Sequence, residues 1–502
     1  MTKKSKMALR KRKQKILKRL ANTKEERITP MMDLGPIKME VMEKRNATAH
    51  GGIGIIHKMN QATGLIDAIN SDLKLFKVHK PYFESDHVMN IAYNLLYGGT
   101  CLEDLEEIRN DTGYMDSLNA IRVPDPTTAG DFLRRFERGD ILDLLEINNQ
   151  NSQKIWWQYN KGKKGKLAIL DIDGKLVETY GEYKEGLDVT YKKFWGFSTL
   201  ILTEMTTGIH LYVINRPGNT LSQEECKEWI DRAIDSLLEN FEKVLIRGDS
   251  AYYLTEYLDE WSKRVDFIFS VDSFEKYIDK AENIKNKGWD ELPRLEKEVV
   301  RDHRHENVKE KVIKDRNFTQ IKQRTEYVSE YRSKPSKSKK EYRMVVVRQL
   351  KEKLAGGLIE GEFYQYFQYI TTVEDKDPAA ILELIRKRFD HENKIEQLAN
   401  GVYAFKMPAK EFEANWAYMV IAAMAWNMKS WLALLMNEIN AELGKKLIEI
   451  EFKRFKNWII NIPCQIIKTG RYVVYKIMSY SLYLKDLMEL AEKLNRKQII
   501  FC

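Results

Sequence analysis

The chain has 502 residues, several times the size of a typical domain, which predicts roughly two to four domains. Hydrophobic residues make up 43% of it and Gly and Pro are few, so the composition excludes a disordered or fibrous protein. The net charge is +9, yet residues 1–20 alone hold ten Lys/Arg and no acid. The basic surplus therefore lies in an N-terminal arm, residues 1–47, which is expected to meet a polyanion or to serve as a solubilising tail.

The chain carries no feature typical of secretion or of a membrane span. The arm lacks the apolar run of a signal peptide, and the longest apolar window, Trp416 to Trp426, is shorter than the roughly 20 residues that cross a bilayer. The four Cys lie far apart with no CxxC pair, which fits a reducing compartment and supplies no zinc site. We expect a cytoplasmic protein without a membrane partner.

Helices and then strands are predicted along the first half of the chain. Residues 48–163 show helical spacing of apolar residues, and residues 164–274 contain short β-branched and aromatic runs typical of buried strands. These runs are 167–172, 197–204, 210–215, 243–247 and 265–271. Helices are expected between the third, fourth and fifth runs, the first opening with a capping box of Ser222 and Glu225. The order predicts a mixed α/β sheet that begins with a meander.

The second half of the chain interrupts this layer and then returns to helices. Residues 275–372 are charged and strand-rich, with an exposed basic loop at 333–340. Residues 373–440 should hold one helix from Asp377 at the N-cap to Gly401, followed by an apolar core helix. Residues 441–502 form a basic C-terminal region.

Acidic residues stand at the ends of two predicted strands. Asp171 and Asp173 end the first strand and, at a period of two, share a face, while Asp249 follows the fourth strand. The carboxyl ends of strands are where open α/β sheets bind ligands. Asp249 also fits the N-cap of a following helix, so capping and a place in an active site both remain open for it.

A third acid lies on the predicted 377–401 helix. A helical wheel places Arg388 and Glu392 inside the apolar stripe, where a lone carboxylate would cost several kcal/mol. An internal pair between these two residues is one explanation. The other is a hard cation held by Asp and Glu oxygens with no His or Cys alongside, for which Mg²⁺ is the physiological candidate.

The order of these elements and four motifs resemble the DDE transposases of bacterial insertion sequences. The motifs are LDIDG at 170–174, NRPGN at 215–219, IRGDSAYY at 246–253 and R-x-x-x-E-N-K-I at 388–395. The resemblance is to the cut-and-paste branch, and it implies a ribonuclease-H-like mixed sheet flanked by helices. It also implies an N-terminal helical DNA-binding region, a β-rich insertion at 275–372 and a catalytic helix after it.

The same resemblance implies the site and the reaction. Asp173, Asp249 and Glu392 become the triad that binds two Mg²⁺ ions, with Mn²⁺ as a substitute and Asp171 as the fallback for Asp173. Arg388 matches the family's signature arginine, and Lys394 is the candidate for its missing lysine. The implied activity is cleavage at the terminal inverted repeats and joining of the 3′ ends to target DNA. A nuclease of the same fold and a catalytically silent DNA-binding regulator are the alternatives.

Double-stranded DNA is the implied partner, held in an expected homodimer that brings two transposon ends together in the nucleoid. Basic clusters that could bind its phosphates lie in the arm, in the loop at 333–340 and near the C-terminus. Solvated faces are the alternative for each cluster. The candidate residues are Arg12, Lys13, Lys337, Lys339, Lys453, Arg454 and Arg471, together with Arg388 and Lys394.

Overall fold

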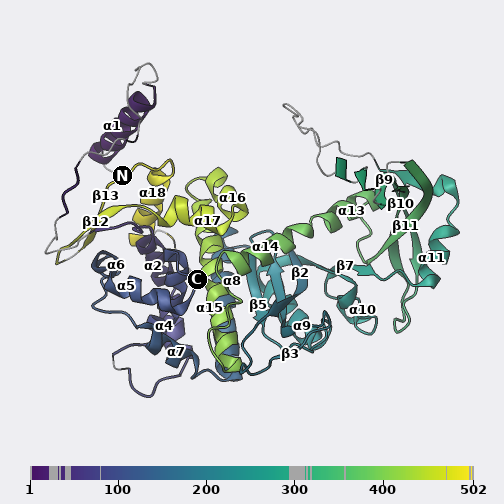
Figure 1. Cartoon of the computed structure of the whole chain (residues 1–502), viewed down its shortest axis with the longest axis horizontal. Coiled ribbons are helices and arrows are strands. Elements are labelled where there is room, and N and C mark those ends of the chain that lie inside the picture. Colours follow the sequence, from purple (N-terminus) through teal and green to yellow (C-terminus); the bar gives the residue numbers. More distant parts are fainter. Residues whose placement is uncertain are drawn as a thin grey trace. The chain divides into compact units, whose positions relative to one another are not determined.

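The structure of the chain is a computed structural model that divides into two compact units, which we describe separately (Figure 1). Unit 1 comprises Met1–Gly165, Lys175–Thr220 and Lys394–Cys502, and unit 2 comprises Lys166–Gly174 and Leu221–Asn393. The residues that the structure describes are 3–21, 32, 36–39, 47–79, 81–292, 311–312, 315–316, 319–355, 358–470, 472–496 and 499.

Unit 1 is mainly helical, as the sequence predicts for residues 48–163. Its N-terminal helices are α1 (Lys3–Leu20), α2 (Ile53–Ala62), α3 (Leu65–Asp72), α4 (Glu84–Tyr97), η1 (Leu102–Asp104), α5 (Leu105–Asn110), α6 (Thr112–Ser117), α7 (Pro126–Leu133) and α8 (Arg138–Tyr159). Its C-terminal helices are most of α14 (Phe389–Asn400), then α15 (Phe412–Met436), α16 (Ala441–Glu449), α17 (Phe452–Phe455), η4 (Lys456–Ile460) and α18 (Leu484–Asn495).

The centre of unit 1 is α15, the predicted core helix. All residues from Ala414 to Met436 are buried, so its polar side chains bond to other parts of the unit. Trp431 Nε1 donates to Ser152 Oγ on α8 at 3.0 Å, and Asn427 Nδ2 donates to Asn148 Oδ1 at 3.0 Å. Within the described residues α15 is the helix long and apolar enough to cross a membrane, and its apolar window is wholly buried.

Two small β elements complete unit 1. In one, β1 (Ala47–Thr48) and β13 (Val473–Ile477) flank β12 (Cys464–Lys468). In the other, the antiparallel pairs are β3 (Asp188–Val189) with β4 (Trp195–Glu204) and β4 with β5 (Ile209–Ile214). The end of β2 (Gly165–Glu178) runs beside β4, where Thr199 Oγ1 donates to Lys175 O at 2.8 Å.

Unit 2 is built on a long mixed sheet. The strands follow the order β2, β6 (Phe241–Gly248), β7 (Asp266–Val271), β11 (Leu358–Thr371), β10 (Tyr342–Ala355), β9 (Thr319–Ser333) and β8 (Asp290–Glu291). The pair β6 and β7 is parallel, whereas β7–β11, β11–β10 and β10–β9 are antiparallel. Its helices are α9 (Cys226–Asn240), η2 (Ser250–Tyr252), α10 (Leu258–Trp261), α11 (Glu275–Glu282), η3 (Asn286–Gly288), α13 (Pro378–Arg386) and the start of α14.

The predicted mixed α/β class and the five predicted strands are confirmed. These strands appear as β2, β4, β5, β6 and β7, because short β-branched runs suit buried strands. The predicted capping box at Ser222 and Glu225 is wrong: α9 begins only at Cys226, and Glu225 lies in the left-handed region at φ 57° with no side-chain cap bond. The Glu224 carboxylate instead accepts from Leu221 N at 3.0 Å, which closes a turn before the helix.

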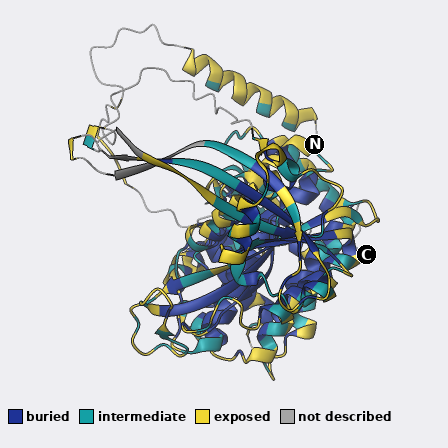
Figure 2. Ribbon diagram, turned by 90° about the vertical axis from the view of Figure 1, so that its right-hand side faces the viewer, coloured by how far each residue is buried: buried dark blue, intermediate teal, exposed yellow. Residues whose placement is uncertain are grey.

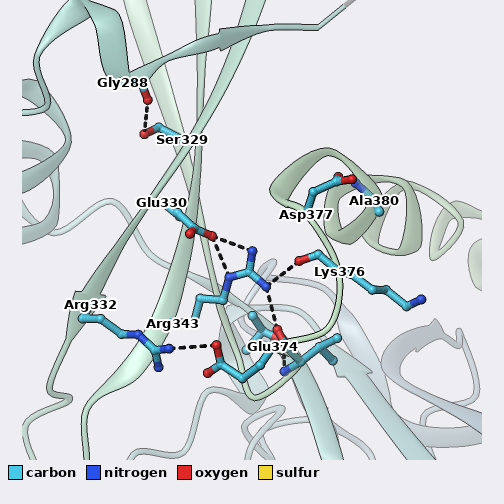
Figure 3. Close-up of polar contacts among 11 residues, drawn as sticks. Gly288, Ser329, Glu330, Arg332, Arg343, Glu374, Lys376, Asp377 and Ala380 are labelled. Atoms are coloured by element: carbon cyan, nitrogen blue, oxygen red, sulfur yellow. Dashed lines mark hydrogen bonds and ion pairs between the residues drawn. The ribbon is translucent and has the colours of Figure 1, made fainter.

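The segment leading into α13 is fixed to the sheet by one buried arginine (Figure 3). Arg343 on β10 donates from Nη1 to Val373 O at 2.8 Å and to Lys376 O at 2.7 Å, and from Nε to Glu330 Oε2 on β9 at 2.7 Å. Asp377 then caps α13 by accepting from Ala380 N at 2.7 Å, as predicted. These bonds fix the start of α13 and therefore also the position at which this helix ends.

Candidate functional site

The predicted carboxylates lie on three elements of unit 2. Asp173 is within β2, Asp249 follows β6 and Glu392 is in the first turn of α14. Because β2 and β6 are neighbours in the sheet, the first two side chains arise from adjacent strands. This juxtaposition is what the positions of the two aspartates in the sequence predicted.

One guanidinium group lies between Asp173 and Asp249. Arg388 Nη2 is 3.1 Å from Asp173 Oδ2 and 3.8 Å from Asp249 Oδ2. The Arg388 and Asp173 side chains are each less than one-fifth exposed. Two carboxylates from neighbouring strands thus converge on one positive group, which is an arrangement that also suits a hard cation with oxygen ligands.

Asp173 is held in an environment that disfavours its charge. Burial raises the pKa of Asp173 to about 6, although Arg388 opposes the shift; Asp249 and Glu392 add to the rise by like-charge repulsion. A carboxylate with a pKa raised by desolvation and by specific neighbouring charges is typical of functional sites. The electrostatic effect of Glu392 also shows that its carboxylate lies near enough to Asp173 to act on it.

Asp171, the fallback ligand, is fully engaged by a second arginine. Arg247 Nε and Nη2 donate to Asp171 Oδ1 and Oδ2 at 2.6 Å each, and both side chains are buried. Burial raises the pKa of Asp171 to about 6, with the Arg247 pair opposing it. Arg247 Nη1 also donates to Leu384 O on α13. Both oxygens of Asp171 therefore face Arg247, and the pair ties β2, β6 and α13 together.

Arg247 is the residue that sequence reasoning missed. It stands in the apolar run of β6 in the motif IRGDS, and it is 2% exposed. An arginine inside a buried strand demands a buried acid, since an unpaired charge there is costly. Asp171, the other charged residue of a neighbouring apolar strand, was the signal that could have identified the pair.

Asp249 combines the two roles that the sequence left open. Its Oδ1 accepts from Ala251 N at 3.0 Å and so caps the short helix η2, whereas its Oδ2 faces Arg388. The capping bond fixes the side-chain rotamer of Asp249, so that its second oxygen is directed toward Arg388. Capping and a place in the site are compatible for this residue.

The expected continuous helix from Asp377 to Gly401 is wrong, and with it the predicted burial of Glu392. The chain forms α13 and α14 with a turn at Lys387–Arg388, where Arg388 N bonds to Ile385 O at 2.9 Å and His391 N to Arg388 O at 2.9 Å. These i to i+3 bonds shift the helical phase. His391 is consequently buried and Glu392 is exposed, and the ion pairs of Arg388 go to the two aspartates.

Two carboxylates of the site are suitable ligands for a divalent cation. Asp173 and Asp249 supply hard oxygen donors around the position that the Arg388 guanidinium occupies. Among the residues that the structure describes, no three His, Cys, Asp or Glu side chains are close enough together to hold a metal ion. Asp173 and Asp249 would therefore hold such an ion first, and Glu392 does not join them in this arrangement.

A cavity of about 460 Å³ adjoins the cluster within unit 2. Its lining includes Arg388, Gly248, which is the residue before Asp249, and the aromatic residues Phe367 and Tyr369 of β11. Glu326 also lines the cavity; it accepts from Gln349 Nε2 at 2.7 Å and pairs with Arg386. The cavity thus combines aromatic walls with a carboxylate close to the cluster.

The candidate DNA-binding residues are spread over both units. In unit 1, α1 has no buried residue and is mostly exposed (Figure 2). Lys13 is exposed, and Arg12 Nη1 donates to Ile477 O at 2.8 Å. Lys453 and Arg454 are also exposed. Arg471 lies outside the described residues.

The structure adds detail about Lys394, which lies in unit 1, and about the basic loop at 333–340, which lies in unit 2. Lys394 lies close enough to the buried His210 in unit 1 to help lower the pKa of that histidine, after burial as the main cause. Lys337 and Lys339 are exposed, but the loop is anchored: Asp259 accepts from Ser338 Oγ and from Lys339 N at 2.6 Å each. The loop is therefore basic and exposed at its lysines, and fixed at its backbone.

Fold and site together define an α/β protein with two aspartates from adjacent strands, Asp173 within β2 and Asp249 after β6, that converge on one arginine. The family model described as Transposase DDE domain group 1 matches residues 38–499. The chain belongs to this family, and it is a DNA transposase of the DDE class. A cryo-electron-microscopy structure of a piggyBac transposase synaptic complex with hairpin DNA is similar at a TM-score of 0.38 and 9% identity, over 91% of this chain and 84% of that chain. No curated protein matches the chain.

Proposed function

We propose that this transposase cleaves DNA at the inverted repeats of an insertion sequence and joins the freed 3′ ends to target DNA. The observation that carries the proposal is the convergence of Asp173, within β2, and Asp249, which follows the neighbouring β6, on the guanidinium group of Arg388. Family membership supports the class of reaction, and these two residues mark the place in the fold where we propose that it occurs.

The proposed cofactor is a pair of Mg²⁺ ions, with Mn²⁺ as a substitute. Such ions activate water or a 3′-hydroxyl and stabilise the leaving 3′ oxygen in phosphoryl transfer. Asp173 and Asp249 bind the first cation, and Glu392 is the third ligand. Glu392 follows the turn at Lys387–Arg388, so a change of backbone angles there would move its carboxylate relative to the aspartates.

The remaining residues of the site position these ligands. The buried pair of Arg247 and Asp171 holds β2, β6 and α13 in register, so that the carboxylates of Asp173 and Asp249 stay on adjacent strands. Phosphate groups of the DNA are held by the exposed basic residues Arg12, Lys13, Lys337, Lys339, Lys453 and Arg454. Arg471, Lys394 and Arg388 complete the proposed set.

Two DNA ends must be held at once, so the proposed active form is a homodimer on double-stranded DNA in the bacterial nucleoid. The salt dependence of DNA binding tests the phosphate-binding residues, because the slope of log affinity against log salt depends on how many phosphates the protein neutralises. Single substitutions to Gln in the arm and in the C-terminal region should each lower that slope by roughly one unit.

The central experiment incubates purified protein with Mg²⁺ or Mn²⁺ and a labelled duplex that carries the repeat flanking the gene. Asp173→Asn, Asp249→Asn and Glu392→Gln are compared with wild type, and Glu396→Gln, an exposed acid one turn further along α14, is the matched control. Each of the three variants should lose nicking and strand joining by at least about a thousandfold, and the control should retain both.

The outcomes separate the proposal from its alternatives. Metal-dependent nicking with no joining would replace it by a nuclease of the same fold. Salt-sensitive binding with no cleavage under either metal would leave a silent DNA-binding regulator. Full activity of Glu392→Gln would remove this residue from the triad without affecting the two aspartates.

A further inference from the structure

Two arginines reach the acidic cluster of unit 2, and they are bonded very differently. Arg247 uses Nε and Nη2 on the two oxygens of Asp171 and Nη1 on Leu384 O. Arg388 reaches the aspartates through Nη2 alone, at 3.1 and 3.8 Å. Within the described part of the chain, the buried Nε of Arg388 has no hydrogen-bond partner. Arg247 is therefore bonded through three of its nitrogens, whereas Arg388 donates one hydrogen bond to these groups, from Nη2 to Asp173 Oδ2.

The position of Arg388 is the one that a cation would occupy. Its guanidinium lies between the carboxylates of Asp173 and Asp249 and neutralises part of their repulsion. A divalent cation at the same place would bring two positive charges against one, and two positive groups cannot share the position at short range. The arginine and the cation must exclude each other.

The chain also provides a place for the guanidinium to go. Arg388 lies at the turn between α13 and α14, where regular helical bonding is interrupted. Its side chain lines the cavity of about 460 Å³ that Glu326 and Tyr369 also line. The Glu326 side chain is 12% exposed, so a second positive group there would meet a largely buried carboxylate.

We infer that Arg388 is an internal counter-ion that occupies the cation position between Asp173 and Asp249 and moves toward Glu326 in the adjoining cavity when a divalent cation binds. This inference rests on the proposed function, because it assigns the cation to those two aspartates. In the absence of metal, Arg388 prevents the two carboxylates from repelling each other. When metal is present, the displaced guanidinium lies beside Glu326 in the adjoining cavity.

Direct metal binding tests the inference without any reaction. Free Mn²⁺ is followed by electron paramagnetic resonance while it is titrated into the full-length protein and its variants. Arg388→Gln should bind Mn²⁺ at least about fivefold more tightly than wild type, because the competing charge is gone. Arg332→Gln removes the same charge at an exposed side chain of unit 2 that pairs with Glu374, and should stay within about twofold of wild type.

Two further variants ensure that the test does not depend on whether a single variant protein folds. Arg388→Lys keeps the charge on a flexible stem without the planar fork, and its affinity should fall between wild type and Arg388→Gln. Glu326→Gln removes the acceptor in the cavity and should weaken Mn²⁺ binding by about threefold. Thermal unfolding without metal should show Arg388→Gln less stable than wild type, with the difference abolished by saturating Mn²⁺.

The results distinguish this inference from the proposed function. Mn²⁺ binding that is lost in Asp173→Asn and Asp249→Asn but equal in wild type and Arg388→Gln would overturn the inference alone. Weaker binding by Arg388→Gln would likewise overturn it and make the arginine a support for the ligands. Absence of binding in wild type and in every variant would overturn both.

Discussion

Two histidines of unit 1 and the paired carboxylates and arginines of unit 2 show two ways of enclosing ionisable side chains. In unit 1, burial lowers the pKa of His57 and of His87 to about 4 each, and these side chains pack as neutral groups against Tyr93 and Phe132. In unit 2, Asp171, Asp173, Arg247 and Arg388 are charged groups arranged in opposition. The contrast teaches that these histidines complete a core as neutral groups, while the carboxylates and arginines on the adjacent strands of unit 2 are kept as opposite charges in pairs.

Breaking the buried pair of unit 2 gives the largest expected effect. Arg247→Met leaves Asp171 buried without a partner and should lower the free energy of unfolding by about 3–5 kcal/mol. Urea unfolding followed by tryptophan fluorescence measures this loss. Asn427→Ala on α15 of unit 1 should cost no more than about 3 kcal/mol, since it removes neutral hydrogen bonds only.

The double variant Asp171→Leu with Arg247→Met is the control for that prediction. Replacing both charges by apolar groups of similar size removes the unpaired charge, so stability should return to within about 1–2 kcal/mol of wild type. A double variant as unstable as the single one would mean that the shape of this site, rather than its charge, carries the stability.

The comparison also shows how far the sequence predicts the structure. Strands β2, β4, β5, β6 and β7 were predictable because apolar β-branched runs bury themselves wherever they are placed. Asp171 and Asp173 could not be distinguished, since a period of two treats them alike and only Arg247 from the neighbouring strand separates them. The exposed position of Glu392 could not be predicted, because the turn at Lys387–Arg388 contains no Gly or Pro that would indicate a break in the helix.

Acid should act in opposite directions on two residues, His87 of unit 1 and Asp173 of unit 2. The pKa of His87 is lower in the folded state than its usual 6.5, so the unfolded chain binds more protons and stability falls as the pH drops from 6.5 to about 4. The pKa of Asp173 is higher when folded, so the folded state binds more protons and this residue's contribution rises as the pH drops from about 6 to 4. Each shift corresponds to roughly 3 kcal/mol across its window.

Matched variants measure the two slopes. His87→Phe preserves the stack on Phe132 and removes the titrating ring, so its stability should depend less on pH below about 6.5 than that of wild type. Asp173→Asn should show a steeper loss of stability on acidification, because the opposing contribution is gone. Urea unfolding between neutral pH and about pH 4.5 gives both slopes, and parallel curves for all three proteins would contradict the assignment.

The smallest expected effect separates the two basic surfaces. The loop with Lys337 and Lys339 is anchored on Asp259, whereas α1 of unit 1 has no buried residue and is mostly exposed. Although burial raises it, hydrogen bonds from Ser338, Lys339 and Tyr342 lower the pKa of Asp259 to about 2. The contribution of this residue is therefore present above about pH 4 and is lost as the pH falls toward 2.

Asp259→Asn should cost about 1 kcal/mol and speed hydrogen exchange at Lys339 and its neighbours, because an amide has one oxygen where the carboxylate uses two. Exchange in α1 should not change. Asp235→Asn, which removes an exposed partner of Arg264, is the control and should leave exchange in the loop at the wild-type rate. If the loop exchanges as fast in wild type as in Asp259→Asn, the anchor does not hold it, and the two basic surfaces would then present their charges to DNA with equal freedom.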